Sequence, residues 1–241
     1  MWDSRIPMSV YARLYVGWRR VWREVEIIES IFRKYGVRRI VEFGCGLGRH
    51  GYLLSKRGFD VLLTDIEDRR FGVAKKLPFK RYNLLEGGSI GVFEGGYAVG
   101  VITLFGYEDI VRILRNIKSV IGSGIFIFDY NFTPYIDPER VEIKINGKKY
   151  IATLEKNKYT QINGGLIYEY RVRVVDEKGS TVGVEEASYP IYNKGEILRA
   201  IEEAGYIVKE IAWASWDPLE YIYKPSDKES DSAFIAITPR Q

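Results

Sequence analysis

Residues 40–51 read Ile-Val-Glu-Phe-Gly-Cys-Gly-Leu-Gly-Arg-His-Gly, an apolar run followed by a glycine-rich turn. Residues 39–43 are mostly apolar and β-branched, which is typical of a buried parallel strand. The glycines at 44, 46 and 48 allow the turn to bring its backbone close to a ligand. A helix is expected to begin within residues 47–50, so that its free N–H groups face whatever lies over the turn. This arrangement predicts a site for an adenosine-containing cofactor.

The glycine turn fits two sequence signatures. Gly46, Gly48 and Gly51 match the GxGxxG pattern of dinucleotide-binding folds. Glu42, Gly44, Gly46 and Gly48 match the acidic, glycine-rich pattern of S-adenosylmethionine-dependent methyltransferases. Because Gly44 directly follows the strand, a dinucleotide pattern beginning at Gly46 would start two residues late. A carboxylate at the end of the strand also suits a cationic amino acid group better than a pyrophosphate. The second signature is therefore favoured, and a nicotinamide enzyme is the less favoured alternative.

Composition limits the class of protein. The 241 residues, 46% of them hydrophobic, suffice for one large domain with a small elaboration. Cys45 is the only cysteine, so an intramolecular disulfide is excluded. No early apolar run resembles a signal peptide and none is long enough to span a bilayer, so we expect a cytoplasmic protein without a membrane partner. Abundant Lys, Arg and Glu with very little Gln are typical of a thermophile, and a net charge of +4 indicates solvated surface more than a nucleic-acid interface.

The order of predicted elements indicates an α/β fold. Apolar residues at helical spacing predict one amphipathic helix over residues 10–35. Strands are predicted at 39–43, 61–64, 80–82, 99–104 and 124–129, and helices at 48–56, 68–75 and 108–121. The link 83–97 contains five glycines, which indicates that the helix of that crossover is reduced.

The pattern changes after residue 129. Five short strands are predicted at 141–145, 149–154, 160–162, 166–175 and 181–190, with hairpin turns such as Asn146-Gly147 and Asn163-Gly164 between them. We expect these strands to form an inserted antiparallel sheet. A helix at 194–204 and strands at 206–212 and 233–238 follow. Since the link 214–232 shows no helix for a parallel crossover, the last strand is predicted to run antiparallel to the others.

With these features, nearly the whole chain resembles class I S-adenosylmethionine-dependent methyltransferases, particularly small archaeal and bacterial members with a β-rich insertion after the fifth strand. The resemblance implies a Rossmann-like sheet, mostly parallel with an antiparallel last strand, helices on both faces and an antiparallel β cap. It divides the chain into an N-terminal helical lid (1–35), a cofactor-binding domain (36–133 and 193–241) and an insertion that covers the acceptor (134–192).

The resemblance also implies cofactor-binding positions, and the implied cofactor is S-adenosylmethionine. The residues that would hold its methionine portion are Glu42, Gly44, Cys45, Gly46 and Gly48. Asp65 ends the next strand and would accept hydrogen bonds from the ribose hydroxyls, with Ile66 against the adenine.

Two further segments complete this set of positions. Asn83 occupies a position that is usually Asp in the family and is followed by Leu84. An Asn can still accept a hydrogen bond from the adenine amino group. The segment 103–107, which includes Leu104, corresponds to the region where the methyl group faces the substrate, and it is shortened here.

Methyl transfer by direct displacement mainly requires alignment of the reacting atoms and exclusion of water. A general base is needed only for an acceptor that arrives protonated, and Asp129, Tyr107 and Glu185 are candidates for it. His50 in the first turn of a helix is more consistent with structure than with catalysis. We assign no catalytic residue and expect no metal. Candidate lid residues are Tyr11 and Tyr15, and candidate acceptor-pocket residues are Tyr189 and Tyr192.

Three functions remain open. A small-molecule methyltransferase is favoured because an aromatic-rich β insertion would enclose a compact pocket. An RNA or protein methyltransferase is the alternative suggested by Arg19, Arg20 and Arg23 on the N-terminal helix. A non-catalytic protein that keeps the fold is suggested by Asn83 and by the shortened segments. The sequence does not indicate the oligomeric state.

Overall fold

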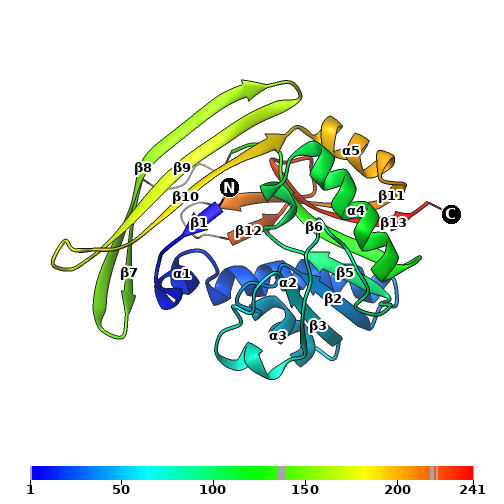
Figure 1. Cartoon of the computed structure of the whole chain (residues 1–241), viewed down its shortest axis with the longest axis horizontal. Helices are drawn as coiled ribbons and strands as arrows, with labels where there is room; N and C mark the ends of the chain where they lie inside the picture. The colour runs from blue at the N-terminus through cyan, green and yellow to red at the C-terminus, as the bar shows by residue number, and fades with distance from the viewer. Residues whose placement is uncertain (1, 135–138, 218–219, 221, 241) are drawn as a thin grey trace.

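The computed structural model describes residues 2–134, 139–217, 220 and 222–240 (Figure 1). Its main sheet has eight strands in the order β12-β11-β13-β6-β5-β2-β3-β4. The strands are β2 (Arg39–Phe43), β3 (Asp60–Asp65), β4 (Phe79–Arg81), β5 (Gly95–Ala98), β6 (Ile125–Asn131), β11 (Tyr206–Asp217), β12 (Ile222–Pro225) and β13 (Ser232–Pro239). Strands β4, β3, β2, β5 and β6 pair in parallel, whereas β13 is antiparallel to both β6 and β11. The predicted reversal of the last strand is confirmed.

Helices cover both faces of this sheet, as predicted. Alternate residues of each strand point to opposite faces. Phe126 and Phe128 of β6 join the core under α4 (Tyr107–Ile121) and α5 (Lys194–Glu203). Ile125 and Ile127 join the core under α2 (Trp18–Lys34) and α3 (Arg49–Lys56). Within the described part of the chain, no helix combines the length and apolar character that a membrane crossing needs.

A second, five-stranded antiparallel sheet, here called the roof sheet, arches over one side of the main sheet (Figure 1). Its order is β1-β10-β9-β8-β7, formed by β1 (Trp2–Ser4), β7 (Arg140–Ile145), β8 (Lys148–Ile162), β9 (Gly165–Asp176) and β10 (Thr181–Tyr192). The helix α1 (Met8–Leu14) packs under it through Val10 and Leu14, which contact a core that includes Ile143 and Val174. The predicted insertion is therefore an antiparallel sheet. Its predicted start at residue 134 borders residues 135–138, which lie outside the described residues.

The strand count predicted for the insertion is wrong. The two strands predicted at 149–154 and 160–162 are one strand, β8, with an irregular register between Leu154 and Lys156. Residues 155–161 are exposed, so this stretch shows no alternation of apolar and polar residues. The fifth strand of the roof sheet is β1, which pairs with β10.

The single helix predicted over residues 10–35 is also wrong, because α1 ends at Leu14 and α2 begins at Trp18. Arginine side chains bind the carbonyls at the break. Arg49 Nη1 donates to the Ala12 carbonyl at 2.9 Å and also to that of Val16, and Arg20 Nη1 donates to the Tyr15 carbonyl at 3.0 Å. These side chains satisfy carbonyls that a continuous helix would have used itself.

Strand β5 lies earlier than predicted. It comprises Gly95–Ala98, whereas residues 99–104 form a turn and a short 3₁₀ helix, η2 (Ile102–Leu104). A Cβ atom on Gly95 would lie 2.8 Å from the Phe32 ring, and one on Gly96 would lie 2.9 Å from the Phe43 ring. The glycines are therefore required by close packing in a buried strand, although in sequence they resemble a loop.

Two smaller differences concern the links, and a third link agrees with its prediction. The helix predicted at 68–75 is only the 3₁₀ helix η1 (Gly72–Lys76). The link between β4 and β5 contains no helix, as predicted. The link after β11 holds the short strand β12, which pairs with β11 and was not predicted.

The packing around β5 gives a test of stability. In Gly96→Ala, the new methyl group would meet the Phe43 and Val41 side chains at 2.9 and 3.2 Å. We expect the free energy of unfolding to fall by about 1–3 kcal/mol, measured by chemical denaturation. Gly106→Ser, in open space at the N-cap of α4, is the control and should change it by less than about 0.5 kcal/mol. Equal stability of Gly96→Ala and the wild type would contradict this account of β5.

Candidate active site

A cavity of about 540 Å³ lies between the main sheet and the roof sheet. Its floor consists of the glycine turn after β2 and residues that follow β3, β4 and β5. Side chains of α1 and α2 line one side, and inner-face residues of β7 to β10 line the top. The carboxyl ends of parallel strands are where open α/β sheets bind ligands. One continuous cavity therefore joins the expected cofactor position to the insertion.

The structure brings nine of the ten predicted cofactor-binding residues to this cavity. Those that line it are Glu42, Gly44, Cys45, Gly46, Asp65, Ile66, Asn83, Leu84 and Leu104. Gly48 is not among the lining residues, because it forms the N-cap of α3 with a φ of 71°. Burial raises the pKa of the Cys45 thiol, which makes it a poor nucleophile and agrees with a packing role. The cofactor contacts of these residues stay predictions.

The glycine turn has the shape of a cradle. Gly44 has a φ of 67°, and a Cβ on it would lie 2.6 Å from Val101. Gly46 and Gly100 line the cavity, and a Cβ built on either of them meets no atom within 4 Å. A side chain at these two positions would extend into open space, which the absence of Cβ atoms leaves available to a ligand. The residues present therefore fit an adenosine-containing group.

The Asp65 carboxylate is held at the edge of the cavity by two backbone donors. Gly46 N–H donates to Oδ2 at 2.8 Å and Ile66 N–H donates to Oδ1 at 2.7 Å. An ionised carboxylate has about four lone-pair sites, so capacity for further donors such as hydroxyl groups remains. These contacts connect the ends of β2 and β3.

The Asn83 side chain stabilises its own turn. Its Oδ1 accepts from the Leu85 N–H at 3.0 Å and its Nδ2 donates to Glu86 at 2.8 Å. These contacts give Asn83 a structural role in its turn. Its proposed contact with the adenine stays a prediction, because Oδ1 has a second lone pair.

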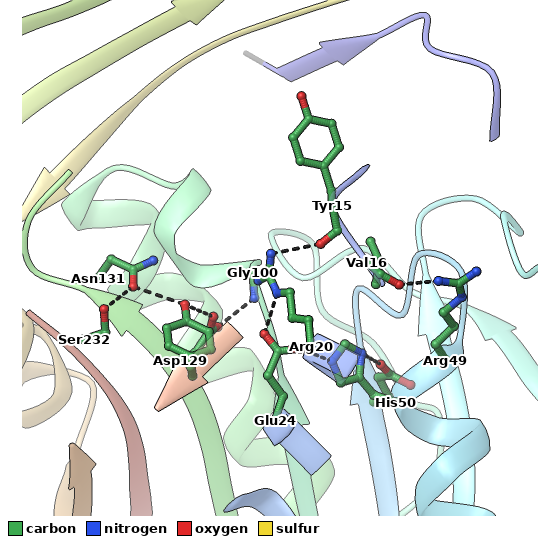
Figure 2. Close-up of polar contacts among 12 residues, drawn as sticks. Tyr15, Val16, Arg20, Glu24, Arg49, His50, Gly100, Asp129, Asn131 and Ser232 are labelled. Atoms are coloured by element: carbon green, nitrogen blue, oxygen red, sulfur yellow. Dashed lines mark hydrogen bonds and ion pairs between the residues drawn. The ribbon is translucent and has the colours of Figure 1, made fainter. Parts of the chain in front are cut away.

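Three charged side chains, Arg20, Glu24 and His50, form a network in the wall of the cavity (Figure 2). Glu24 and His50 are buried, and Arg20 is partly buried. Arg20 Nε donates to Glu24 Oε1 at 2.7 Å, and the other oxygen of Glu24 lies 2.6 Å from His50 Nε2. Burial opposes ionisation of Glu24, but Arg20 and His50 hold its pKa below the ordinary value. Burial likewise disfavours protonated His50, but Glu24 raises its pKa above the ordinary value. Each residue therefore stabilises the charged form of the other.

Glu42 lies next to this network in a different environment. Its Oε2 accepts from the Gly51 N–H at 3.0 Å, and its Oε1 lies 3.8 Å from His50 Nδ1. Burial raises the pKa of Glu42 to about 7. A Cβ on Gly51 would lie 2.7 Å from the carboxylate, so the glycine allows α3 to approach it closely.

The end of β6 contributes a further polar group. The Gly100 N–H donates to Asp129 Oδ1 at 2.7 Å, and burial, followed by the charge of Glu24, raises the pKa of Asp129 to about 6. Asn131 accepts from Ser232 at 2.7 Å and from Tyr223 at 3.1 Å (Figure 2). Asn131 lines the cavity, whereas Asp129 is not among the lining residues.

The roof sheet places the remaining candidates. Glu185 and Tyr189 line the cavity, as do Tyr11 and Tyr15 from the N-terminal segment. Tyr192 instead accepts from the Tyr107 N–H at 3.0 Å. The Tyr107 hydroxyl donates to Glu203 on α5, outside the set of cavity-lining residues. Of the three base candidates, only Glu185 therefore lines the cavity.

Sequence reasoning missed the roles of Arg20 and Glu24 in this network. A signal was present, because Glu24 falls on the apolar stripe of α2 between Val21, Val25 and Ile28, all of them buried. A charged residue is rarely buried without a partner. An acidic residue at a position that faces the core is therefore the pattern that could have revealed the network.

With this geometry established, the comparisons with known proteins can be given. The sequence matches no protein-family model and no curated protein. The structure is similar to a sugar N-methyltransferase from Streptoalloteichus (TM-score 0.68, 14% identity, 92% of this chain and 88% of that chain). It is also similar to an S-adenosylmethionine-dependent methyltransferase from Clostridium acetobutylicum (TM-score 0.68, 12% identity, 97% of each chain). A third similar structure is an amino pentose methyltransferase from Micromonospora echinaspora, solved with S-adenosylmethionine bound (TM-score 0.66, 13% identity, 96% and 94%).

These likenesses extend over nearly the whole chain. The chain therefore has the fold of class I S-adenosylmethionine-dependent methyltransferases, and the predicted fold class is confirmed.

The buried network predicts a large effect of Glu24→Ala. The substitution leaves the buried His50 and the partly buried Arg20 without their shared carboxylate. Removing one partner of a buried ion pair costs about 3–5 kcal/mol, which should appear as a lower free energy of unfolding in urea. Glu26→Ala removes an exposed carboxylate of the same helix and should cost less than about 1 kcal/mol. Similar losses in the two variants would refute a special role of the network.

The raised pKa of Glu42 predicts a dependence of stability on pH. The folded protein keeps a proton on Glu42 up to about pH 7, whereas the unfolded chain releases it near 4.5. Stability therefore falls as the pH rises through this window. Glu42→Gln removes the titrating group, so its stability relative to the wild type should rise between these pH values, by at most about 1.4 kcal/mol per pH unit. Urea unfolding at several pH values tests this, with Glu26→Gln as the exposed control. If the difference in stability between Glu42→Gln and the wild type did not change with pH, the burial argument would be contradicted.

Proposed function

We propose that this chain is an S-adenosylmethionine-dependent methyltransferase that acts on a small-molecule acceptor. The observation that carries the proposal is the continuity of the cavity. Gly44, Gly46 and Asp65 line its floor, and the tyrosine-rich inner face of the roof sheet lines its top. A volume of about 540 Å³ lies within the range of pockets that enclose small ligands.

Each group of residues has one task in this proposal. The backbone of the glycine turn holds the methionine portion of the cofactor, and Asp65 accepts hydrogen bonds from the ribose hydroxyls. Ile66 and Leu84 provide apolar surface for the adenine. The N-terminal segment closes one side of the cavity, where Arg20 and Arg49 hold its backbone at Tyr15 and Ala12.

When bound, S-adenosylmethionine supplies an electrophilic methyl group on a sulfonium. The protein contributes alignment of the acceptor and exclusion of water. Protein nucleophiles are not required, which agrees with the structural roles of His50 and Cys45. A carboxylate such as Glu185 is needed only when the acceptor must lose a proton.

Similar structures support a small acceptor. Two of the proteins described above act on sugars or amino pentoses. A further similar structure is a methyltransferase from Burkholderia thailandensis that was solved with 1,6-didemethyltoxoflavin and S-adenosylhomocysteine bound. A cavity of about 540 Å³ has the size of a small-molecule pocket, which supports an acceptor of this kind.

The observation that suggested an RNA substrate finds no support in the structure. Arg20 is part of the internal network. Arg19 pairs with Glu220 at 3.1 Å and Arg23 pairs with Glu26 at 3.0 Å. These pairs neutralise the basic helix face that phosphate binding would require.

Calorimetric titration with S-adenosylmethionine and S-adenosylhomocysteine tests the proposal. The wild type should bind both, and Asp65→Ala should weaken binding at least tenfold, because a hydrogen bond to a charged group contributes about 1.5–3 kcal/mol. Asp60→Ala, at the exposed start of the same strand, is the control and should bind as the wild type does.

Three outcomes would decide against parts of this proposal. Unchanged affinity of Asp65→Ala would refute the assignment of Asp65. Binding of NADH in place of both sulfur compounds would support the dinucleotide signature. Cofactor binding without transfer of labelled methyl to any compound in a broad acceptor library would favour the non-catalytic alternative.

A further inference from the structure

We propose that the acceptor carries an aromatic ring, which packs against a cluster of tyrosine rings on the inner face of the roof sheet. This inference rests on the proposed function and names the substrate class of the same site. It is carried by the position, the packing and the chemistry of the side chains that the roof sheet presents to the cavity.

Strand pairing places three tyrosines next to each other on the inner face of the roof sheet. Tyr168 of β9 lies directly opposite Tyr189 of β10 in the antiparallel register. Tyr170 lies two residues further along β9, so its side chain points to the same face as that of Tyr168. All three side chains line the cavity. The backbone of the sheet therefore fixes an aromatic surface at the top of the cavity.

Contacts between the rings hold this surface in place. The Tyr189 ring meets those of Tyr168 and Tyr170 edge to face, with centroids 5.7 and 6.4 Å apart. Tyr159 of β8 stacks on Tyr168, with centroids 5.0 Å apart and an interplanar angle of 10°. A further aromatic ring can join such a cluster edge to face or offset-stacked. Because the tyrosines already restrain one another, little conformational freedom is lost when a ligand packs against them.

The roof sheet presents few polar groups beside these rings. The Tyr170 hydroxyl donates to Glu185 Oε1 at 2.5 Å. Burial, followed by the charge of Glu185, raises the pKa of Tyr170, so this hydroxyl stays protonated and remains a donor. The other cavity-lining side chains of β7 to β10 are two tyrosines and aliphatic residues such as Leu154 and Val172. Over the described length of these strands, no amide, Ser, Thr or basic side chain lines the cavity.

Most charged lining residues lie on other sides of the cavity. Arg20 comes from α2 and His50 from α3, whereas Asp65 and Arg69 come from the end of β3 and the link that follows it. The floor and one side of the cavity are therefore charged. The roof is aromatic and aliphatic apart from Glu185, which the Tyr170 hydroxyl contacts.

This division selects the chemistry of the acceptor. A hydroxyl group that leaves water needs a new hydrogen-bond partner, and a ring with many hydroxyls would find too few partners on the roof. An apolar ring gains free energy when it leaves water, and an aromatic ring gains more by packing against tyrosine rings. The roof sheet therefore fits an aromatic acceptor better than a hydroxyl-rich sugar.

Three six-membered rings test this preference. Phenol is aromatic with one hydroxyl, cyclohexanol is aliphatic with one hydroxyl, and myo-inositol is aliphatic with a hydroxyl on every carbon. Each is titrated into the protein saturated with S-adenosylhomocysteine, and binding is followed by ligand-detected NMR. Phenol should bind at least about twofold tighter than cyclohexanol, as expected for contacts between aromatic rings. Cyclohexanol should bind at least about tenfold tighter than myo-inositol, whose hydroxyls would lack partners.

Substitutions at Tyr189 locate the preference in the roof sheet. Tyr189→Leu removes the ring that contacts both Tyr168 and Tyr170, so it should equalise the affinities for phenol and cyclohexanol and leave that for S-adenosylhomocysteine unchanged. Tyr189→Phe keeps the ring and should keep the preference for phenol. Tyr150→Leu is the matched control and should behave as the wild type does, because Tyr150 belongs to β8 but is not among the cavity-lining residues. If Tyr189→Leu fails to fold, the ranking of the probes by the wild type decides.

The outcomes separate this inference from the proposed function. Failure of the wild type to bind S-adenosylmethionine or S-adenosylhomocysteine would refute the proposed function. Normal cofactor binding without binding of phenol, with phenol bound no tighter than cyclohexanol, or with myo-inositol bound as tightly as cyclohexanol would refute the aromatic inference alone. A full preference for phenol in Tyr189→Leu would do the same.

Discussion

The structure depends on the buried contact between Glu24 of α2 and His50 of α3. His50 lies two residues after Gly48, so this 2.6 Å contact joins α2 directly to the first turn of α3, at the end of the glycine turn. Arg20 extends the link, because it binds Glu24 and the Tyr15 carbonyl at once. Since a buried charge without a partner is costly, these residues fix the position of α2 relative to the turn. The glycine turn and α2, which lines one side of the cavity, are thereby held together.

Neither sheet forms the cavity by itself, and the N-terminal segment connects the two. Its strand β1 pairs with β10 of the roof sheet, α1 packs under β7, and α2 lies on the main sheet. The insertion leaves the main sheet after β6 and returns to it at α5, so both of its ends are anchored near the carboxyl end of β6. The roof sheet is therefore held over the main sheet in two ways. The chain connects it to β6 and α5, and the N-terminal segment contacts both sheets.

Much of the fold could be predicted from periodicity in the sequence, and the failures have physical reasons. The strand, glycine turn and helix at 39–56 follow local rules, and so do the hairpins of the insertion and the reversed last strand. Gly95 and Gly96 were misread because their close packing against Phe32 and Phe43 is a tertiary contact. The break in the N-terminal helix depends on Arg20 and Arg49, and the latter lies far along the chain. Candidate cofactor positions could be named from the glycine turn and the family resemblance, and nine of the ten line the cavity. The charged network could not be named, because its members come from separate elements.

The division of the cavity between two sheets has a consequence for specificity. The residues expected to contact the cofactor follow strands of the main sheet, whereas Tyr168, Tyr170 and Glu185 belong to the roof sheet. Substitutions at sites that share no partners have nearly additive effects on free energy. Under the proposed function, changes on the inner face of the roof would therefore alter which acceptor binds while the glycine turn and Asp65 keep their geometry. A roof built from β-strands suits this role, because every second residue faces the cavity and the outer residues can maintain the hydrogen-bonded frame.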